Sequence, residues 1–473
     1  MAAQQKSRRS GLPAPVQRVR DVNATSTLIE TTFRVITPLH GGGVSGGTGH
    51  DSVTPVRGAS IRGQLRFWWR AVFAHRFNTV EALSRAEAGL WGTGAREGCA
   101  SRVAQWVTAP TELPTTVDLY ERGNNTSWRT TDGWEGVAYL ARAYVPKRGA
   151  PRVEPLIRLP GEYKISLRIS GSSSWADQVN CALQAWLTFG GVGGRTRRGF
   201  GAVDGALTHR RPTQLLSELR SQEIDFEGTD GGSYAIPLVA QLPATSAGIA
   251  FGRQEFGFGA PDMDGVTPAE RAWIEAANKL RHFRQGEGMG RVSRRDKPRD
   301  APPNRPGRSY WPEPDQIRSL RGLTSDPQSK RASRGLPRKF PRAEFGMPIE
   351  FEFFGDRDVY YRVNNQTNTV RGDRVLDKHS LNPAGKDRMA SPLVLRPRQS
   401  SAQDGVYKAM ALQLHVPHLA DVLSGLQLTD SLSGSVDVVD ARLTPSEADR
   451  IRPMNTVGGP VGNSAVAAFL KYL

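Results

Sequence analysis

The sequence has little of what marks several common protein classes. Its only two cysteines, Cys99 and Cys181, are too few for a disulfide framework or a thiolate metal site. No apolar run approaches the roughly 18 residues that a membrane span needs. The first 20 residues are basic but lack the apolar segment of a secretory signal. We therefore expect a cytoplasmic protein without membrane contact.

Clusters of residues that carry chemistry are also scarce. The acidic residues form no D-x-D or E-x-x-H pattern for magnesium or zinc, and no P-loop spacing is present. Hydrophobic residues make up 38% of the chain, which is low for a compact protein, while 50 glycines and 32 prolines predict long loops. We expect no cofactor, no metal ion and no enzymatic activity.

Positive charge is the property that the chain has in excess. Lys and Arg number 63 against 46 Asp and Glu, a formal net charge of +17. Most of these cations are arginines, whose planar group binds phosphate and stacks on bases. The charge favours a nucleic-acid partner. The alternative is a general preference for arginine that limits aggregation by repulsion.

The first part of the chain predicts one α+β domain over residues 25–210, preceded by a disordered basic arm at 1–24. Residue alternation predicts strands at 28–37, 162–170 and 202–208. Helical periodicity predicts a helix at 60–77 capped by Ser60, a shorter helix at 81–91 and a helix at 174–189. A mobile glycine-rich loop from Gly41 to Gly49 follows the first strand. With weak strands between 101 and 160, this order is that of a ferredoxin-like (RRM-like) βαββαβ domain with long loop insertions.

A second ferredoxin-like domain is expected over residues 230–473. Its predicted strands are 234–241, 348–354, 358–363 and 405–416. Its predicted helices are 267–283, capped by Thr267, and a terminal helix at 464–472. It carries a basic insertion, residues 281–342. The tracts 281–308 and 318–342 hold nine and eight basic residues without a period, so we expect loops or disorder there. Trp311 between them is expected to anchor the insertion.

Two segments have the composition of an RNA-binding site. The first is GGVGGRTRRGFG at 190–201, whose glycines open the backbone and whose guanidiniums bind phosphate; its candidates are Gly193, Gly194, Arg195, Thr196, Arg197 and Arg198. The second is the helix with a basic stripe beside tryptophans; its candidates are Arg57, Ser60, Arg62, Arg66, Trp69 and Arg70. Trp68 and Trp69 at helical spacing are also consistent with core packing.

Together the two segments resemble the RAMP superfamily of CRISPR proteins, and the helix resembles the first-numbered subunit of its type III-B (Cmr) module. Further similar stretches are SYWPEPDQIR (309–318), FPRAEFGMPIEFEF (340–353) and RMASPLVLRP (388–397). The resemblance implies two ferredoxin-like domains and a non-catalytic subunit at the head of an antiviral ribonucleoprotein complex. Such a subunit lies near the 3′ end of the guide RNA (crRNA), beside another RAMP subunit, and helps to capture target RNA.

Two other functions stay open at this point. His40 ends the first predicted strand, and histidine suits proton transfer near pH 7, so a metal-independent RNA endonuclease of the RAMP type is the first alternative. No second histidine lies near it in the sequence to act as the acid. A basic DNA-binding or assembly protein is the second alternative.

Overall fold

The structure is a computed structural model, and it describes most of the chain in segments. These are residues 25–41, 51, 54–94, 98–123, 127–141, 154–205, 211–222, 224, 226, 232–257, 265–292, 309–321, 336–353, 359–363, 366–370, 378–400, 405–455 and 462–473. The basic arm at 1–24, most of the loop from Gly41 to Gly49, and residues 293–308 and 322–335 of the basic insertion lie outside the described residues.

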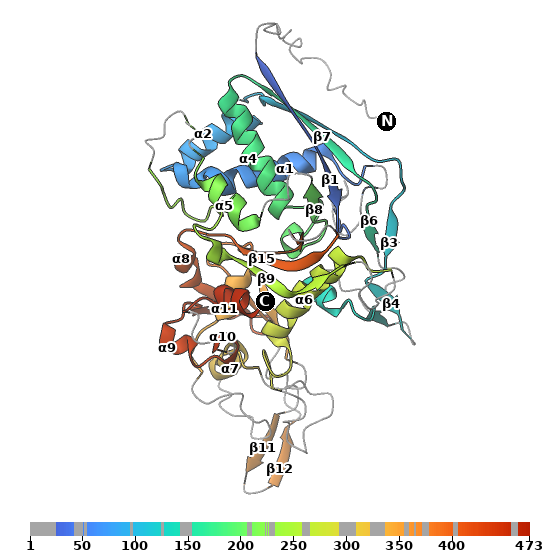
Figure 1. The fold of residues 1–473 in the computed structure, drawn as a ribbon. Coiled ribbons are helices and arrows are strands. Elements are labelled where there is room, and N and C mark those ends of the chain that lie inside the picture. The colour runs from blue at the N-terminus through green and yellow to red at the C-terminus, as the bar shows by residue number, and fades with distance from the viewer. Residues whose placement is uncertain are drawn as a thin grey trace, which may run out of the picture.

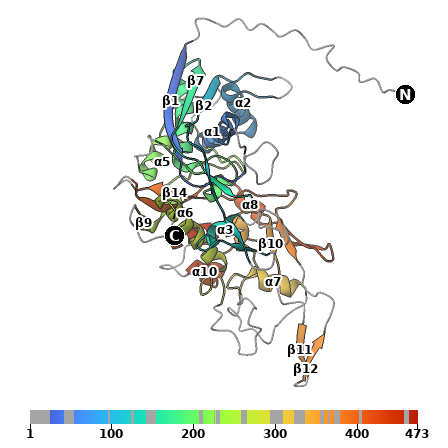
Figure 2. The ribbon, with the colours of Figure 1, turned by 90° about the vertical axis from the view of Figure 1, so that its right-hand side faces the viewer.

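The N-terminal unit is a four-stranded antiparallel sheet covered by helices. Its strands β1 (Ser26–Val35), β2 (Val103–Thr108), β7 (Tyr163–Ser170) and β8 (Val203–Gly205) lie in the order β2-β7-β1-β8. The helices are α1 (Gly58–Phe73), α2 (Val80–Trp91), α4 (Ser173–Phe189) and α5 (Pro212–Arg220). Figure 2 shows α1 and α2 on one side of this sheet. The order strand, helix, strand, strand, helix, strand is the order predicted from the sequence.

Small elements inserted between β2 and β7 extend toward the second unit. They are β3 (Thr115–Val117), β4 (Tyr120–Arg122), β5 (Trp128–Thr130), α3 (Glu135–Leu140) and β6 (Leu156–Arg158), with β3 paired to β6 and β4 to β5. Helix α3 packs closely on α6 (Pro268–Gln285), because a Cβ at Gly136 would lie 2.5 Å from Asn278. The insertion therefore joins the two units (Figure 1).

The second unit has a three-stranded sheet in the described residues rather than the predicted four strands. Its strands β9 (Ile249–Phe256), β14 (Leu393–Gln399) and β15 (Tyr407–Gln413) lie in the order β14-β15-β9, and α6 and α11 (Ala465–Tyr472) pack on it. The capping box predicted at Thr267 is present, with Glu270 as its partner. The predicted strand at 234–241 is wrong: Pro237 lacks a backbone donor and Leu238 has a positive φ of 59°, so the chain cannot extend there.

A further sheet lies beyond these strands. It contains β10 (Ile349–Phe351), β13 (His379–Asn382), β16 (Leu426–Asp430) and β17 (Val436–Val439), in that order. Short helices accompany it: α7 (Glu313–Leu320), α8 (Leu419–Leu423), α9 (Pro445–Ala448) and α10 (Arg452–Asn455). The hairpin of β11 (Val359–Val363) and β12 (Gln366–Val370) projects away from the rest (Figure 1). The whole is a mixture of helices and small antiparallel sheets.

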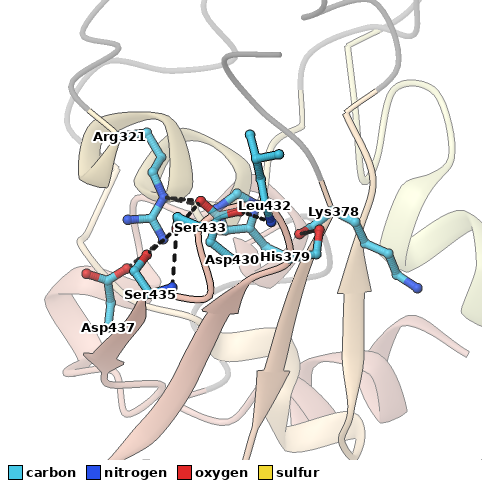
Figure 3. A network of polar contacts seen from close by, with 9 residues as sticks. Arg321, Lys378, His379, Asp430, Leu432, Ser433, Ser435 and Asp437 are labelled. Carbon is cyan, nitrogen blue, oxygen red and sulfur yellow. Dashed lines mark hydrogen bonds and ion pairs between the residues drawn. The ribbon is translucent and has the colours of Figure 1, made fainter. Parts of the chain in front are cut away.

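Part of the basic insertion is ordered, contrary to the expectation of loops throughout. Residues 281–285 end α6, and α7 occupies residues 313–320. Arg321, directly after α7, donates to Asp437 Oδ2 at 2.8 Å and to His379 Nε2 at 3.2 Å, and its Nε lies 3.5 Å from Asp430 (Figure 3). Trp311 is fully buried and donates to Phe283 O at 3.2 Å, so it anchors the insertion as predicted.

Buried charges join the two units at their common boundary. Arg396 of β14 is 1% exposed and donates to the carbonyls of Gly190 and Val203 in the N-terminal unit. Its neighbour Arg398 lies 3.5 Å from the buried carboxylate of Asp204. Each of these interactions crosses between the two units, which makes the sheets interdependent.

Candidate nucleic-acid interface

The glycine-rich loop, residues 190–201, runs from the end of α4 to β8 along the segment that follows β1. Gly194 N donates to His40 O at 2.7 Å, and Thr37 Oγ1 donates to Gly199 O at 2.6 Å. Gly199 has a φ of +84°, and a Cβ there would lie 2.5 Å from Nε1 of Trp273 in α6. The glycine is thus required for close packing between the units as well as for the turn itself.

The three loop arginines are half-buried and bridge different segments of the chain. Each guanidinium donates to a backbone carbonyl: Arg195 to Leu140 (2.7 Å), Arg197 to Ser391 (2.6 Å) and Arg198 to Phe345 (3.1 Å). Burial lowers the pKa of Arg197, and burial together with neighbouring arginines lowers the pKa of Arg198 to about 10. The loop is therefore wedged between the units, and its three arginines keep part of their surface exposed. Phosphate binding by these residues stays a prediction.

The basic stripe of α1 also has structural partners. Arg66 Nε and Arg70 Nη1 donate to the same carboxylate oxygen of Glu87 in α2, at 2.7 and 2.5 Å. Arg62 donates to the carbonyl of Trp91. Glu87 is 7% exposed, and a buried carboxylate is strongly destabilising unless it is paired. The stripe thus holds α2 on α1, while the side chains of Arg66 and Arg70 keep about a third of their surface exposed, 35% and 33%.

The start of α1 differs from the prediction. The helix begins at Gly58 with Arg57 in the N-cap position, and no side chain caps it. Ser60 lies in the first turn, half-buried, and is not the cap. Arg57 is also half-buried.

Trp69 is not a platform for RNA bases. It has no exposed surface, its indole donates to Gln178 Oε1 at 3.0 Å, and its ring packs on Phe73, Phe77 and Phe226. Trp68 is 2% exposed. The core interpretation of the two tryptophans is therefore the right one, because both fall on the buried face of α1, which packs against α4.

A basic cleft lies where α1, the glycine-rich loop and the second unit meet. It encloses about 360 Å³. Four cations line it, Arg70, Arg197, Lys386 and Arg388, and no described lining residue is acidic. Its apolar wall includes Leu238, Val416 and Leu419. We refer to this site as the basic cleft.

Phe67 supplies an aromatic ring to the basic cleft. It is half-buried beside the fully packed Trp68, and the guanidinium of Arg197 lies 4.9 Å from its ring centroid. A ring next to guanidiniums is the arrangement that stacks a base while cations hold its phosphate. Phe67 thus has the position beside guanidiniums that the sequence led us to expect of Trp69.

The basic cleft contains residues that the sequence predicted as RNA-binding and residues that it did not. Arg70 and Arg197 come from the two predicted segments, 127 positions apart in numbering, and only folding brings them together. Lys386 and Arg388 are exposed and were not singled out. Their only signal was the similar stretch that begins at Arg388. Gly193, Gly194 and Thr196 lie half-buried in the loop but do not line the cleft.

His40 lies beside the loop, away from open solvent. It is 5% exposed, and its ring meets Phe200 edge-on with 5.6 Å between centroids. Burial, with Arg195 nearby, lowers its pKa to about 4. The ring is therefore neutral near pH 7 but is buried where a substrate hydroxyl would have to reach it.

Two further features are absent from the described residues. Among them, no group of three or more His, Cys, Asp or Glu side chains has the arrangement of a metal site. No helix in the described part of the chain has the length and apolar character to cross a membrane.

Comparison with known proteins gives one family match and several similar solved structures. The crystal structure of Cmr1 from Pyrococcus furiosus in its apo form is 15% identical, with a TM-score of 0.38, and the alignment covers 82% of this chain and 88% of that one. Two cryo-EM structures of type III-B Cmr-beta bound to cognate target RNA are 11% and 12% identical, with TM-scores of 0.43 and 0.41. They cover 83% and 82% of this chain, and 95% and 94% of theirs. No curated protein matches.

The family match falls on the part of the chain that contains β1, α1, α4 and the glycine-rich loop. Residues 32–204 match the family model of the RAMP superfamily. The two segments from which the resemblance was inferred, 55–71 and 190–201, both lie inside this range. Over residues 32–204 this chain is therefore similar to the RAMP superfamily.

Proposed function

We propose that this protein is a non-catalytic RNA-binding subunit of a type III-B CRISPR ribonucleoprotein complex. In this proposal it binds guide RNA (crRNA) and target RNA in the cytoplasm, beside other RAMP subunits. It lies at the head of the complex near the guide RNA 3′ end and helps to capture target RNA in antiviral defence. Both units are variants of the ferredoxin-like fold, the second with an additional sheet.

The basic cleft is the observation that carries the proposal. It combines four cations, an aromatic ring and no acidic lining residue among those described. Phe67, Arg70 and Arg197, which line it, lie within the residues that match the RAMP superfamily model. Guanidinium and ammonium groups bind phosphates of any sequence, and a ring stacks any base. This chemistry fits a single-stranded RNA that other components of the complex select.

The test uses two cations that line the basic cleft and project into solvent. We predict that the Lys386→Ala and Arg388→Ala double variant binds single-stranded RNA more weakly. The slope of log affinity against log salt should fall by about 0.7 for each phosphate that the two cations no longer neutralise. Fluorescence anisotropy with labelled RNA at several salt concentrations measures both. Arg195, Arg197 and Arg198 are less suitable targets, because their replacement also removes hydrogen bonds between segments.

The matched control removes two exposed cations outside the cleft, Arg253 and Arg450. Their alanine double variant should keep the affinity and the salt slope. Equal effects of the two double variants would contradict the assignment of the cleft. Competition by single-stranded DNA as strong as that by RNA would favour the DNA-binding alternative.

A further inference from the structure

The outer face of the N-terminal sheet carries a second group of side chains suited to RNA. Side chains alternate along a strand, so Ile165, Leu167 and Ile169 of β7 are buried toward the helices. The intervening residues of β7 face away from them, and α1 and α2 lie on the buried side (Figure 2). The register places Trp106 of β2 and Glu30 of β1 opposite Ser166, and Leu28 of β1 opposite Arg168.

Trp106 is the central side chain of this open face. It is 42% exposed, the one exposed tryptophan among the described residues, whereas five others have less than 2% exposure. Leu28 near it is 51% exposed. Large apolar rings are costly to leave in water, so an exposed ring on a flat sheet marks a surface that receives a partner.

The charges around Trp106 indicate what that partner is. The guanidinium of Arg168 lies 5.5 Å from the Trp106 ring centroid, and Lys164 is exposed on the same face. The one acidic side chain in this group, Glu30, lies 3.0 Å from Lys164 and accepts from Ser166 at 2.7 Å. Two cations against one carboxylate leave an excess of positive charge beside the ring, which complements a polyanion. A ring with adjacent cations stacks a base while the cations bind phosphate.

We propose that the open face formed by Leu28, Trp106, Lys164 and Arg168 is a second single-stranded RNA contact, in which a base stacks on Trp106. Stacking on aromatic side chains of a four-stranded sheet is an established physical route to single-stranded RNA binding. This inference rests on the proposed RNA-binding function. It concerns a surface on the outer face of the sheet, whereas the basic cleft lies at the junction of the two units.

Photocrosslinking of the purified full-length chain to RNA that contains 4-thiouridine tests the proposal directly. Trypsin cuts after Arg102 and Arg122, so Trp106 is carried on the peptide 103–122. We expect a nucleotide adduct on this peptide, and its loss in Trp106→Ala. The affinity of Trp106→Ala for single-stranded RNA should fall about tenfold, because stacking of one base on an aromatic ring contributes that order of affinity. Trp106→Phe keeps a ring and should retain most of the affinity.

The matched control is Val438→Ala. Val438 is 77% exposed on the edge strand β17 of the other unit, so its loss tests the effect of removing exposed apolar surface in general. It should leave RNA affinity unchanged, and all variants should melt at the wild-type temperature.

Two results would overturn the proposal while leaving the basic cleft in place. In the first, the adduct is absent and Trp106→Ala binds RNA normally, although the Lys386 and Arg388 double variant binds weakly. In the second, Trp106→Ala binds RNA normally but no longer co-purifies with a neighbouring subunit, so the face docks protein. If neither set of variants affects RNA binding, the proposed function itself fails.

Discussion

At the residue scale, the partner of a charge decides what that charge can do. The arginines of α1 occur every four residues, and this spacing alone fits an exposed phosphate-binding stripe as well as an anchor for another helix. In this structure Arg66 and Arg70 hold α2 on α1, because the buried carboxylate of Glu87 in α2 requires cationic partners. Arg70 nevertheless also lines the basic cleft, so one guanidinium contributes to both packing and the candidate site.

His40 gives a prediction at the same scale. We expect His40→Asn to leave any RNA cleavage by the assembled complex intact, because the ring is buried away from substrate. Its pKa in the folded state, about 4, lies below its ordinary value of 6.5. The unfolded chain therefore binds more protons between these pH values, and the contribution of a neutral His40 to stability, full above pH 6.5, is lost as pH falls toward 4.

The measurements are cleavage of labelled RNA and chemical unfolding between pH 7.5 and 4.5. The variant should show a weaker loss of stability on acidification than the wild type. Some loss should persist, since burial and the nearby Arg220 and Arg76 also lower the pKa of His75 to about 4. Loss of cleavage with RNA binding retained would establish the endonuclease alternative instead.

At the element scale, the glycine-rich loop acts through its backbone shape. Its glycines were expected to bring the backbone near a phosphate, but Gly199 is needed where the loop passes Trp273 of α6. Hydrogen bonds join the loop to Thr37 and His40. Further hydrogen bonds run from its arginines to the backbone carbonyls of Leu140 and Ser391. It therefore presents Arg197 to the basic cleft from a fixed position.

Gly199→Ala is the corresponding prediction. An added Cβ meets Trp273 and requires a non-glycine residue at φ +84°, so we expect a loss of more than about 1 kcal/mol in the free energy of unfolding. Gly63→Ala is the matched control. Gly63 lies in the exposed interior of α1 with nothing within 4 Å of the added atom, and the change should stabilise by roughly 0.5–1 kcal/mol. Urea unfolding measures the free energy of unfolding of both variants. Similar values for the two would contradict close packing of the loop against Trp273.

At the scale of the whole molecule, the two units depend on one another. Arg396 of β14 donates hydrogen bonds to the carbonyls of Gly190 and Val203 in the N-terminal unit. Arg398 of β14 forms an ion pair with Asp204 of the same unit. The basic cleft has walls from both units. A separated N-terminal unit would therefore lack part of the candidate site.

Asp204→Ala tests this dependence. It leaves the buried Arg398 without its carboxylate, so we expect a loss of about 3–5 kcal/mol in the free energy of unfolding. Glu255→Ala breaks the exposed pair of Glu255 with Lys408 and should change little. Denaturant unfolding followed by tryptophan fluorescence reports both units, which contain Trp69 and Trp273 respectively. Equal stability of the Asp204 and Glu255 variants would show that the boundary charges do not hold the units together.

The sequence by itself determined the strongly periodic elements and the excess of positive charge. The first strand, α1, α4, α6 and α11 follow from residue alternation or helical periodicity, because burial of one face requires that spacing. The excess of arginine favours a nucleic-acid partner, as do the two motifs, which lie inside residues 32–204. The strands β9 and β14 were missed because charged residues and a proline interrupt their apolar pattern, Arg253 and Glu255 in β9 and Arg396, Pro397 and Arg398 in β14. The pattern at 234–241 resembles a strand although its backbone cannot adopt one.

Only the tertiary structure decided which of the basic and aromatic residues line the basic cleft. Trp69 and Phe67 are two positions apart, yet one is fully buried and the other lines the basic cleft. Arg195, Arg197 and Arg198 lie within four consecutive residues, but their partners Leu140, Ser391 and Phe345 come from distant parts of the chain. Periodicity describes one element at a time. The availability of a guanidinium depends on the carbonyls and carboxylates that other elements bring to it, and these become its neighbours only when the chain has folded.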